Sequence, residues 1–93
     1  MIIVQSWFGR LGNNIIQLSN IIDIALVYKH NIIFNVNHRL FNLNIITDYF
    51  IKYNNDELIT DEYNFYYKSK LPYSKKIFEQ NIEERDKIIQ EAF

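Results

Sequence analysis

The sequence predicts an α/β protein built on a βαβ unit with two parallel strands. Two short apolar runs, residues 2–5 and 32–36, are rich in Ile and Val and have the composition of buried strands. A long, mostly apolar segment with helical length separates them, from residue 13 to about residue 30. A strand, a helix and a second strand in this order form a crossover connection, which joins parallel strands.

Length and composition restrict the chain to one small domain. Its 93 residues are 48% hydrophobic, which argues against a disordered chain. A chain of this size removes only about 60–65% of its unfolded surface from water, so its core is small. Because Cys is absent, disulfides and thiolate metal ligands are excluded. The net charge of −1 and the lack of a Lys/Arg block give no support for nucleic-acid binding.

The first strand is followed by a turn, predicted for residues 7–12, that contains both glycines of the chain, Gly9 and Gly12. Glycine tolerates positive φ angles and the close approach of another backbone, which suits a reversal from a strand into a helix. Trp7 and Phe8 flank this turn, where they either shield a ligand or anchor the loop in the core.

The helix is predicted to begin near Asn13, a residue type that favours the N-cap, and to end near His30 and Asn31. Apolar side chains cover most of its circumference, so we expect a core helix. These positions are Ile15, Ile16, Leu18, Ile21, Ile22, Ile24, Ala25, Leu26 and Val27. A single polar stripe with i, i+4, i+7 spacing consists of Asn13, Gln17 and Asn20. Polar interruptions keep the segment short of the roughly 20 apolar residues of a membrane span.

The rest of the chain carries weaker signals. Residues 37–44 are predicted to be a loop, and residues 47–53 a short helix capped by Thr47. Residues 63–67 are mostly aromatic and predict a strand, whose rings either pack on a helix or stack on sugar rings. Residues 82–93 have the apolar spacing of an amphipathic helix, with acidic side chains near its N-terminal end.

The turn and the start of the helix are a candidate anion site. The first N–H groups of a helix and its dipole favour a bound negative charge. Arg10 would add charge-assisted hydrogen bonds, and Asn13 and Asn14 would present amide groups at the same mouth. A phosphate, a diphosphate or a phosphorylated sugar suits this geometry. Plain turn chemistry also explains the spacing, because Gly9 and Gly12 match neither the dinucleotide-binding motif nor the P-loop.

The run from Gly9 to Asn14, Gly-Arg-Leu-Gly-Asn-Asn, follows a predicted strand and precedes an apolar helix. It resembles the G-R/G-x-G-N-Q segment of the fucosyltransferase superfamily, which includes α-1,2-fucosyltransferases, bacterial α-1,6 enzymes and protein O-fucosyltransferases. In these families the segment opens the N-terminal Rossmann-like half of a GT-B fold. The resemblance covers residues 1–36 and implies a partial Rossmann-like parallel-sheet unit.

The resemblance implies GDP-fucose as the donor, inversion at its anomeric carbon, and a glycan or protein hydroxyl as the acceptor. It implies no metal and no cofactor besides the donor substrate. The residues implied in substrate binding are Gly9, Arg10, Gly12, Asn13 and Asn14, with Asn13 near the sugar-phosphate region of the donor. Asn14 stands where the family usually has Gln, so its amide is one methylene shorter.

A second motif of these enzymes, of the type H-x-R-x-G-D, does not occur in the sequence; His38 and Arg39 are adjacent and do not match it. A GT-B enzyme needs two Rossmann-like domains that face each other. We therefore expect residues 1–93 to form a single incomplete domain, which is the N-terminal segment of a larger glycosyltransferase, a truncated reading frame or a decayed copy. By itself, this chain is expected to transfer no fucose.

Two non-catalytic alternatives remain open. The chain could be a small α/β interaction module, whose sheet is completed by a partner or in a homo-oligomer through an exposed sheet edge. It could also be a nucleotide-binding remnant without transfer. A metal site is not expected, because His30 and His38 are separated by a strand and nearby carboxylates lack ligand spacing. Without a signal peptide or membrane span, a cytoplasmic location is the default expectation.

Overall fold

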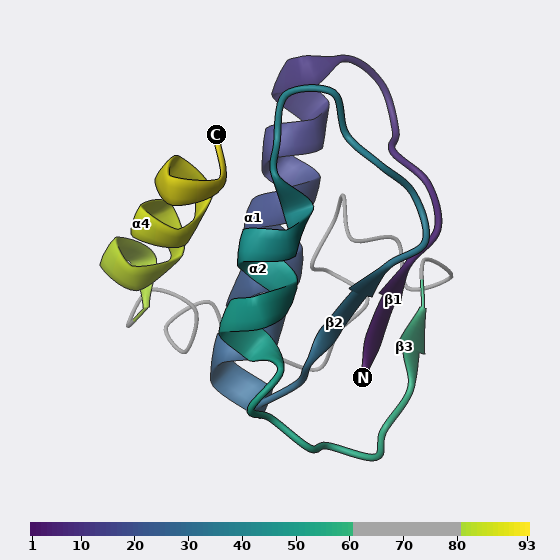
Figure 1. Ribbon diagram of the computed structural model, residues 1–93, viewed down its shortest axis with the longest axis vertical. Coiled ribbons are helices and arrows are strands. Elements are labelled where there is room, and N and C mark those ends of the chain that lie inside the picture. Colours follow the sequence, from purple (N-terminus) through teal and green to yellow (C-terminus); the bar gives the residue numbers. More distant parts are fainter. Residues whose placement is uncertain (61–80) are drawn as a thin grey trace.

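The computed structural model describes residues 1–60 and 81–93, which form a three-stranded sheet and three helices (Figure 1). The elements are β1 (Ile2–Val4), α1 (Leu11–Tyr28), β2 (Ile32–Phe34), α2 (Leu43–Phe50), β3 (Ile59–Thr60) and α4 (Ile82–Ala92). Strand β1 is central, and both of its neighbours, β2 and β3, run parallel to it. The predicted α/β class and the parallel βαβ unit are therefore confirmed.

One face of the sheet packs against the core. Ile2 is fully buried, and the strand register pairs it with Ile32 and Ile59, which are buried too. Side chains alternate between the two faces along a strand, so Ile3 and its cross-strand neighbour Ile33 share the opposite face. Other parts of the protein cover that face less completely, since Ile33 remains 37% exposed there.

Helix α1 supplies more of the core than any other described element, and does so from its later turns. The buried apolar residues of α1 are Leu18, Ile21, Ile22, Ile24, Ala25 and Leu26. The expectation that Ile15 and Ile16 also belong to the core is wrong, since they are 38% and 47% exposed. The helix has 18 residues and spans about 27 Å. The strands are three residues or fewer and span about 10 Å, so the first turns of α1 extend past the sheet (Figure 1).

Helix α1 begins earlier than predicted, at Leu11. Arg10 has the extended conformation of an N-cap, and its carbonyl accepts the N–H of Asn14 at 3.0 Å. The prediction of Asn13 as the N-cap is therefore wrong, and Gly12 lies inside the first helical turn. A glycine in a helix costs only about 1 kcal/mol, which the packing of a long helix easily offsets.

The end of α1 is set by Lys29, which adopts the left-handed conformation with φ 59° and ψ 48°. The N–H groups of Lys29 and His30 both donate to the carbonyl of Ala25, a common way to close a helix. The helix thus ends before the predicted His30–Asn31. The left-handed conformation is unfavourable for residues other than Gly and Asn. Lys29 is therefore an unusual residue for the end of a helix, and the sequence gives no clear signal of this end.

The ring of His30 lies in the core and does not face the end of the helix. It is fully buried, and its Nδ1 lies 3.0 Å from the amino nitrogen of Met1. Burial, followed by the charge of that amino group, lowers the pKa of His30. The same amino group donates to the carbonyls of Asn55 and Glu57 at 2.9 and 2.7 Å. These contacts fasten the segment before β3 to the start of β1.

Helix α2 begins at Leu43, and the prediction of Thr47 as its cap is wrong. Asn42 is the N-cap, with its side-chain oxygen accepting the N–H of Asn44 at 3.2 Å. The buried face of α2 consists of Leu43, Ile46 and Phe50. Because Leu43 is buried, the apolar face begins about one turn before Thr47. The helix is therefore capped by Asn42, the residue just before Leu43.

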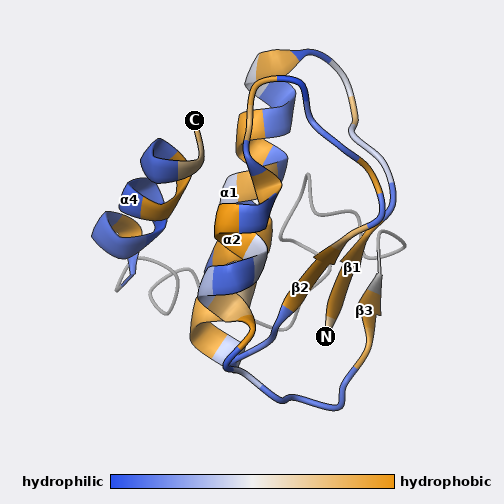
Figure 2. Cartoon of the chain, viewed as in Figure 1, coloured by the Kyte–Doolittle hydropathy of each residue, from blue (hydrophilic) through white to orange (hydrophobic). Residues whose placement is uncertain are grey.

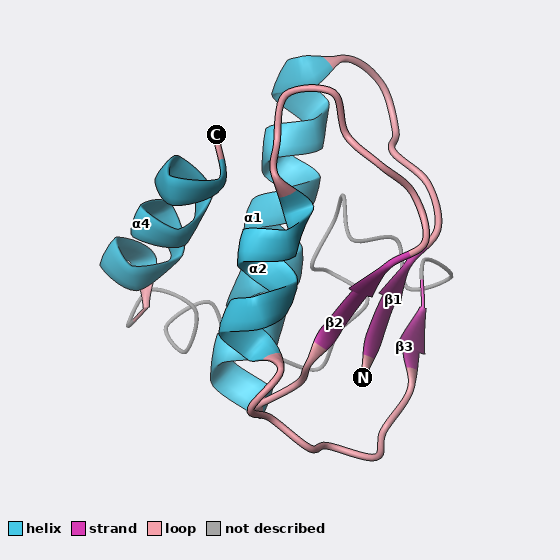
Figure 3. Ribbon diagram, viewed as in Figure 1, coloured by secondary structure: helices cyan, strands magenta, loops and turns pink. Residues whose placement is uncertain are grey.

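The predicted helix over residues 82–93 is confirmed as α4, which packs against both α1 and α2 (Figure 3). It is strongly amphipathic, with Ile88 and Ala92 buried and an outer surface that is mostly hydrophilic (Figure 2). Strand β3 has only two residues and was not predicted. The aromatic strand predicted for residues 63–67 lies outside the described residues. None of the described helices is long and apolar enough to cross a bilayer.

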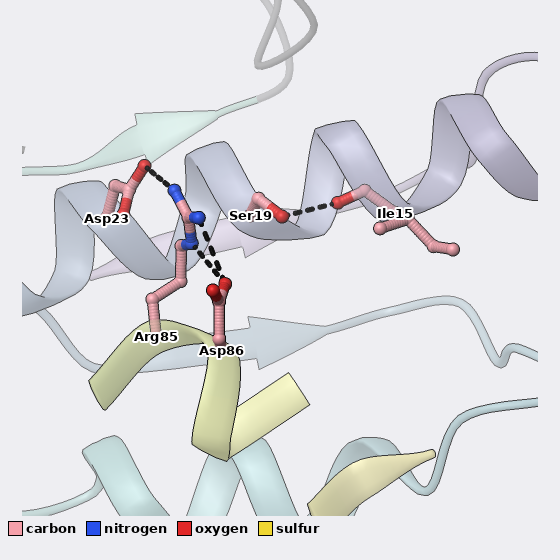
Figure 4. Close-up of polar contacts among 5 residues, drawn as sticks. All are labelled: Ile15, Ser19, Asp23, Arg85 and Asp86. Atoms are coloured by element: carbon pink, nitrogen blue, oxygen red, sulfur yellow. Dashed lines mark hydrogen bonds and ion pairs between the residues drawn. The ribbon is translucent and has the colours of Figure 1, made fainter. Parts of the chain in front are cut away.

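One ion pair joins α1 to α4 (Figure 4). Asp23 is 0% exposed, and its Oδ2 lies 3.2 Å from a guanidinium nitrogen of Arg85. Arg85 also contacts the more exposed Asp86 at 2.9 Å. Asp23 belongs to the face of α1 that continues through Ser19 and Ile15 at four-residue spacing. Burial of a carboxylate is costly unless a cation accompanies it, so α4 is needed to complete the core around α1.

Replacement of Arg85 should therefore destabilise the protein. Arg85→Ala leaves the buried Asp23 carboxylate without this cation, and we expect the free energy of unfolding to fall by about 2–3 kcal/mol. Urea denaturation followed by circular dichroism measures this change. Lys87→Ala, on the exposed side of the same helix, is the control and should stay within about 0.5 kcal/mol. Equal effects of the two substitutions would contradict a structural role for the ion pair.

Candidate glycine-loop site

The chain leaves the carboxyl end of β1 in a loop, residues 5–10, that leads into α1; we call it the glycine loop (Figure 1). Two polar side chains of α1 fasten it. The Oε1 atom of the fully buried Gln17 accepts the N–H of Phe8 at 3.1 Å, and its Nε2 donates to the carbonyl of Ser6 at 2.9 Å. Asn14 donates from Nδ2 to the carbonyl of Phe8 at 2.8 Å. Backbone groups that no neighbouring strand can satisfy are thus paired with α1.

Asn14 was expected to present its amide at the mouth of the site, and this expectation is wrong. Its side chain is buried and turned toward the glycine loop. The residue positions the loop and is not open to a ligand. Gln17, predicted only as part of a polar stripe, shares this role. The two residues are three apart, so they lie on the same side of α1.

Trp7 anchors the glycine loop. Its Nε1 donates to the carbonyl of Asn37 at 2.9 Å, and its ring stacks on Phe34 with centroids 6.0 Å apart. The sequence left two roles open for Trp7, shielding a ligand or anchoring the loop, and in the structure it anchors the loop. Phe8 remains largely exposed next to it.

The two glycines serve different purposes. Gly9 has a φ of +71°, in the region that side-chain-bearing residues rarely adopt. A Cβ atom there would also lie 2.1 Å from Nδ2 of Asn13, so the half-buried Asn13 side chain covers this position. Gly12 sits in the first turn of α1, and a Cβ there would meet nothing within 4 Å. Only Gly9 is required by the turn itself.

The N-terminal end of α1 is open. Arg10, Leu11 and Gly12 are all exposed, and no side chain caps the helix. The first backbone donor of the helical ladder is the N–H of Asn14, so Leu11 and Gly12 have no acceptor within the helix. Arg10 forms no ion pair with residues 1–60 or 81–93. An exposed guanidinium beside these donors can bind an anion such as a phosphate.

His38, from the loop between β2 and α2, is the residue that the sequence analysis missed. Its Nδ1 accepts the backbone N–H of Leu40 at 3.1 Å, and its Nε2 lies 3.0 Å from Oδ1 of Asn14. A backbone N–H can only donate, so Nδ1 carries no proton and Nε2–H donates to Asn14. Burial, and next the charge of Arg39, lower the pKa of His38, which favours this neutral form.

The start of α1 lies on the surface of the described part of the chain, where Arg10, Leu11 and Gly12 are exposed. A groove of about 460 Å³ lies between α1 and α4 and includes Ile15, Phe41 and Phe93 in its lining, but none of residues 5–12. No group of three or more His, Cys, Asp or Glu side chains in the described ranges could hold a metal ion. The geometry therefore supports anion binding through backbone N–H groups and Arg10.

The chain was compared with protein-family models, with curated proteins and with solved structures, and none of them matches it. The candidate site is therefore defined by its own geometry, which consists of the bend at Gly9, the open start of α1 and the exposed Arg10.

Alanine substitutions should separate the two glycines. Gly9→Ala forces an alanine into the left-handed region and against Asn13, and should lower the free energy of unfolding by about 1–2 kcal/mol. Gly12→Ala places a better helix former in open space and should raise it by about 0.5–1 kcal/mol. Urea denaturation of both variants measures the two changes. Changes of the same sign would show that the two positions are equivalent, contrary to this structure.

Proposed function

We propose that this chain is the donor-binding N-terminal segment of a fucosyltransferase-like glycosyltransferase, with a Rossmann-like arrangement of its strands. The observation that carries the proposal is the exposed bend at Gly9, which leads into the open start of α1 beside Arg10. This bend falls within the run Gly9–Asn14, whose sequence resembles the glycine-containing segment of that superfamily.

The order of the strands supports a ligand at this place. From β1 the chain crosses to β2 on one side and then returns across the sheet to β3 on the other. In open α/β sheets, ligands bind outside the carboxyl ends of the strands where the direction of the connections reverses. The glycine loop leaves the carboxyl end of β1, next to this reversal.

The chemistry of the donor matches the groups present. GDP-fucose carries a diphosphate, whose charge suits Arg10 and the N–H groups of Leu11 and Gly12. The lack of a side chain at Gly9 lets Asn13 fold over the bend, which places its amide beside the start of α1. In the proposed family reaction, an acceptor hydroxyl attacks the anomeric carbon with inversion and the diphosphate leaves. The protein contributes positioning and charge stabilisation.

Calorimetric titration with GDP and with GDP-fucose tests the proposal. We expect both to bind, and we expect Arg10→Ala to weaken binding about tenfold, because a charge-assisted hydrogen bond is lost. Lys52→Ala is the matched control: it removes an exposed positive charge near Tyr53 and Lys29, at the opposite end of α1. Absence of binding, or equal weakening by both variants, would refute the proposal. Since this chain by itself is expected to transfer no fucose, equal affinities for GDP and GDP-fucose would favour the nucleotide-binding remnant, whereas tighter binding of GDP-fucose would favour the donor site.

A second candidate function, an interaction module, is favoured by one specific observation. Parallel sheets normally have both faces covered, yet Ile33 of β2 is 37% exposed on the face that it shares with Ile3. In addition, β2 and β3 form the two edges of the described sheet. A partner or a second copy that covers Ile33 or pairs with an edge would complete the structure.

Light scattering coupled to size-exclusion chromatography tests this alternative. If the sheet is completed by self-association, the wild-type chain should form oligomers at high concentration, and Ile33→Lys should shift the equilibrium toward monomers. Ile51→Lys alters an even more exposed apolar residue at the end of α2 and should change nothing. A wild-type protein that stays monomeric at high concentration would count against self-association.

A further inference from the structure

The glycine loop and the loop between β2 and α2 are joined by one directional chain of hydrogen bonds. Leu40 N–H donates to Nδ1 of His38, whose Nε2–H donates to Oδ1 of Asn14. Asn14 in turn donates from Nδ2 to the carbonyl of Phe8. The first and last groups are backbone atoms with a fixed polarity, so every link between them has only one possible direction.

This chain requires a neutral imidazole. A second proton on His38 would sit on Nδ1 and face the N–H of Leu40, and two donors cannot bond to each other. The ring would have to leave this position, which would also remove the donor that orients Asn14. Loss of this contact would loosen the hold of α1 on the glycine loop at Phe8.

Two features of its surroundings disfavour the charged form of His38, namely its partial burial and the positive charge of Arg39. The ring of Trp7, from the glycine loop, lies 5.0 Å from it, and the ring of Phe41 lies 4.8 Å away. From α1 it meets the neutral amide of Asn14. The charged group that acts on it is Arg39, which has the same sign as a protonated imidazole. No carboxylate of the described residues contributes a compensating charge.

We propose that His38 is a pH-sensitive latch, whose neutral form orients Asn14 to hold the glycine loop at Phe8 and whose protonation weakens that hold in mildly acidic solution. The loosening at Phe8 follows from the hydrogen-bond chain, while Gln17 still holds Ser6 and the N–H of Phe8. Its consequence for a ligand, namely weaker binding of a nucleoside diphosphate after release, rests on the proposed function of the site.

The direction of the pH dependence follows from the lowered pKa of His38. Above about 6.5, the ordinary value, the side chain is neutral in both the folded and the unfolded chain, and the latch contributes fully. As the pH falls through that value, the unfolded or released chain takes up the proton first. The latch therefore weakens on acidification.

Fluorescence of Trp7 provides the first test, because Trp7 is the only tryptophan of the chain and its ring touches His38. We expect the emission of the wild-type protein to change with a single midpoint below about 6.5. His38→Gln, which keeps a donor toward Asn14 but does not titrate, should abolish this transition. His30→Gln removes the other histidine and should retain it. A flat wild-type profile, or a transition that persists in His38→Gln, would overturn the proposal.

Nuclear magnetic resonance of the wild-type protein provides a second readout that needs no folded variant. The ring signals of the two histidines show directly which of them titrates with the amide signals of Phe8 and Leu40. At neutral pH, His38→Asn keeps an acceptor for Leu40 but not the donor to Asn14, so exchange of the Phe8 amide should be about fivefold faster. His38→Gln should leave that amide protected. Equal protection in both variants would argue against a latch.

Titration with GDP at pH 7.5 and pH 5.5 separates the latch from the proposed function. We expect at least about fivefold weaker binding to the wild-type protein at the lower pH, after subtraction of the change seen with His38→Gln. That variant corrects for the titration of the phosphate itself. If GDP never binds while Trp7 still titrates, the proposed function fails and the latch stands. If GDP binds with the same pH dependence in both proteins, the latch fails and the proposed function stands.

Discussion

Backbone polar groups need partners wherever the chain leaves the sheet, and this requirement shapes the region around β1. Residues 6–8 have no neighbouring strand, so the amides of Asn14 and Gln17 take the place of a strand. They reach the loop only because α1 begins directly after it and presents both side chains to the same side. The helix start, the loop and the parallel crossover therefore depend on one another. A change in any of them would leave buried polar groups without hydrogen-bond partners.

The larger elements could be predicted because their signals are local. Apolar β-branched runs indicated β1 and β2, and helical spacing indicated α1 and α4. The errors arise where distant contacts decide. Strand β3 is two residues long and exists through its pairing with β1. Ile15 and Ile16 have the character of core residues but lie beyond the end of a very short sheet, and no periodicity reveals where a sheet ends.

In the candidate site, too, features with a local sequence signal could be predicted and features set by distant contacts could not. The turn needs glycine at residue 9, and the structure gives it a positive φ and keeps Arg10 and Gly12 exposed, as a site requires. Composition could not distinguish Asn13 from Asn14, which differ in burial because a helix turns by about 100° per residue. The role of His38 could not be predicted from the sequence, since its partner Asn14 lies on another element and their contact depends on how two loops meet.

The pairing of Asp23 with Arg85 has a consequence for the order of assembly, because these residues are 62 positions apart in the sequence. A growing polypeptide emerges from its N-terminal end, so the carboxylate on α1 stays hydrated until the chain has been synthesised as far as α4. Only then can α4 dock and expel water from that side of the helix. Until α4 docks, this side of the strand–helix–strand unit stays exposed to water, and the slow closure expected of such distant contacts follows the formation of the local ones.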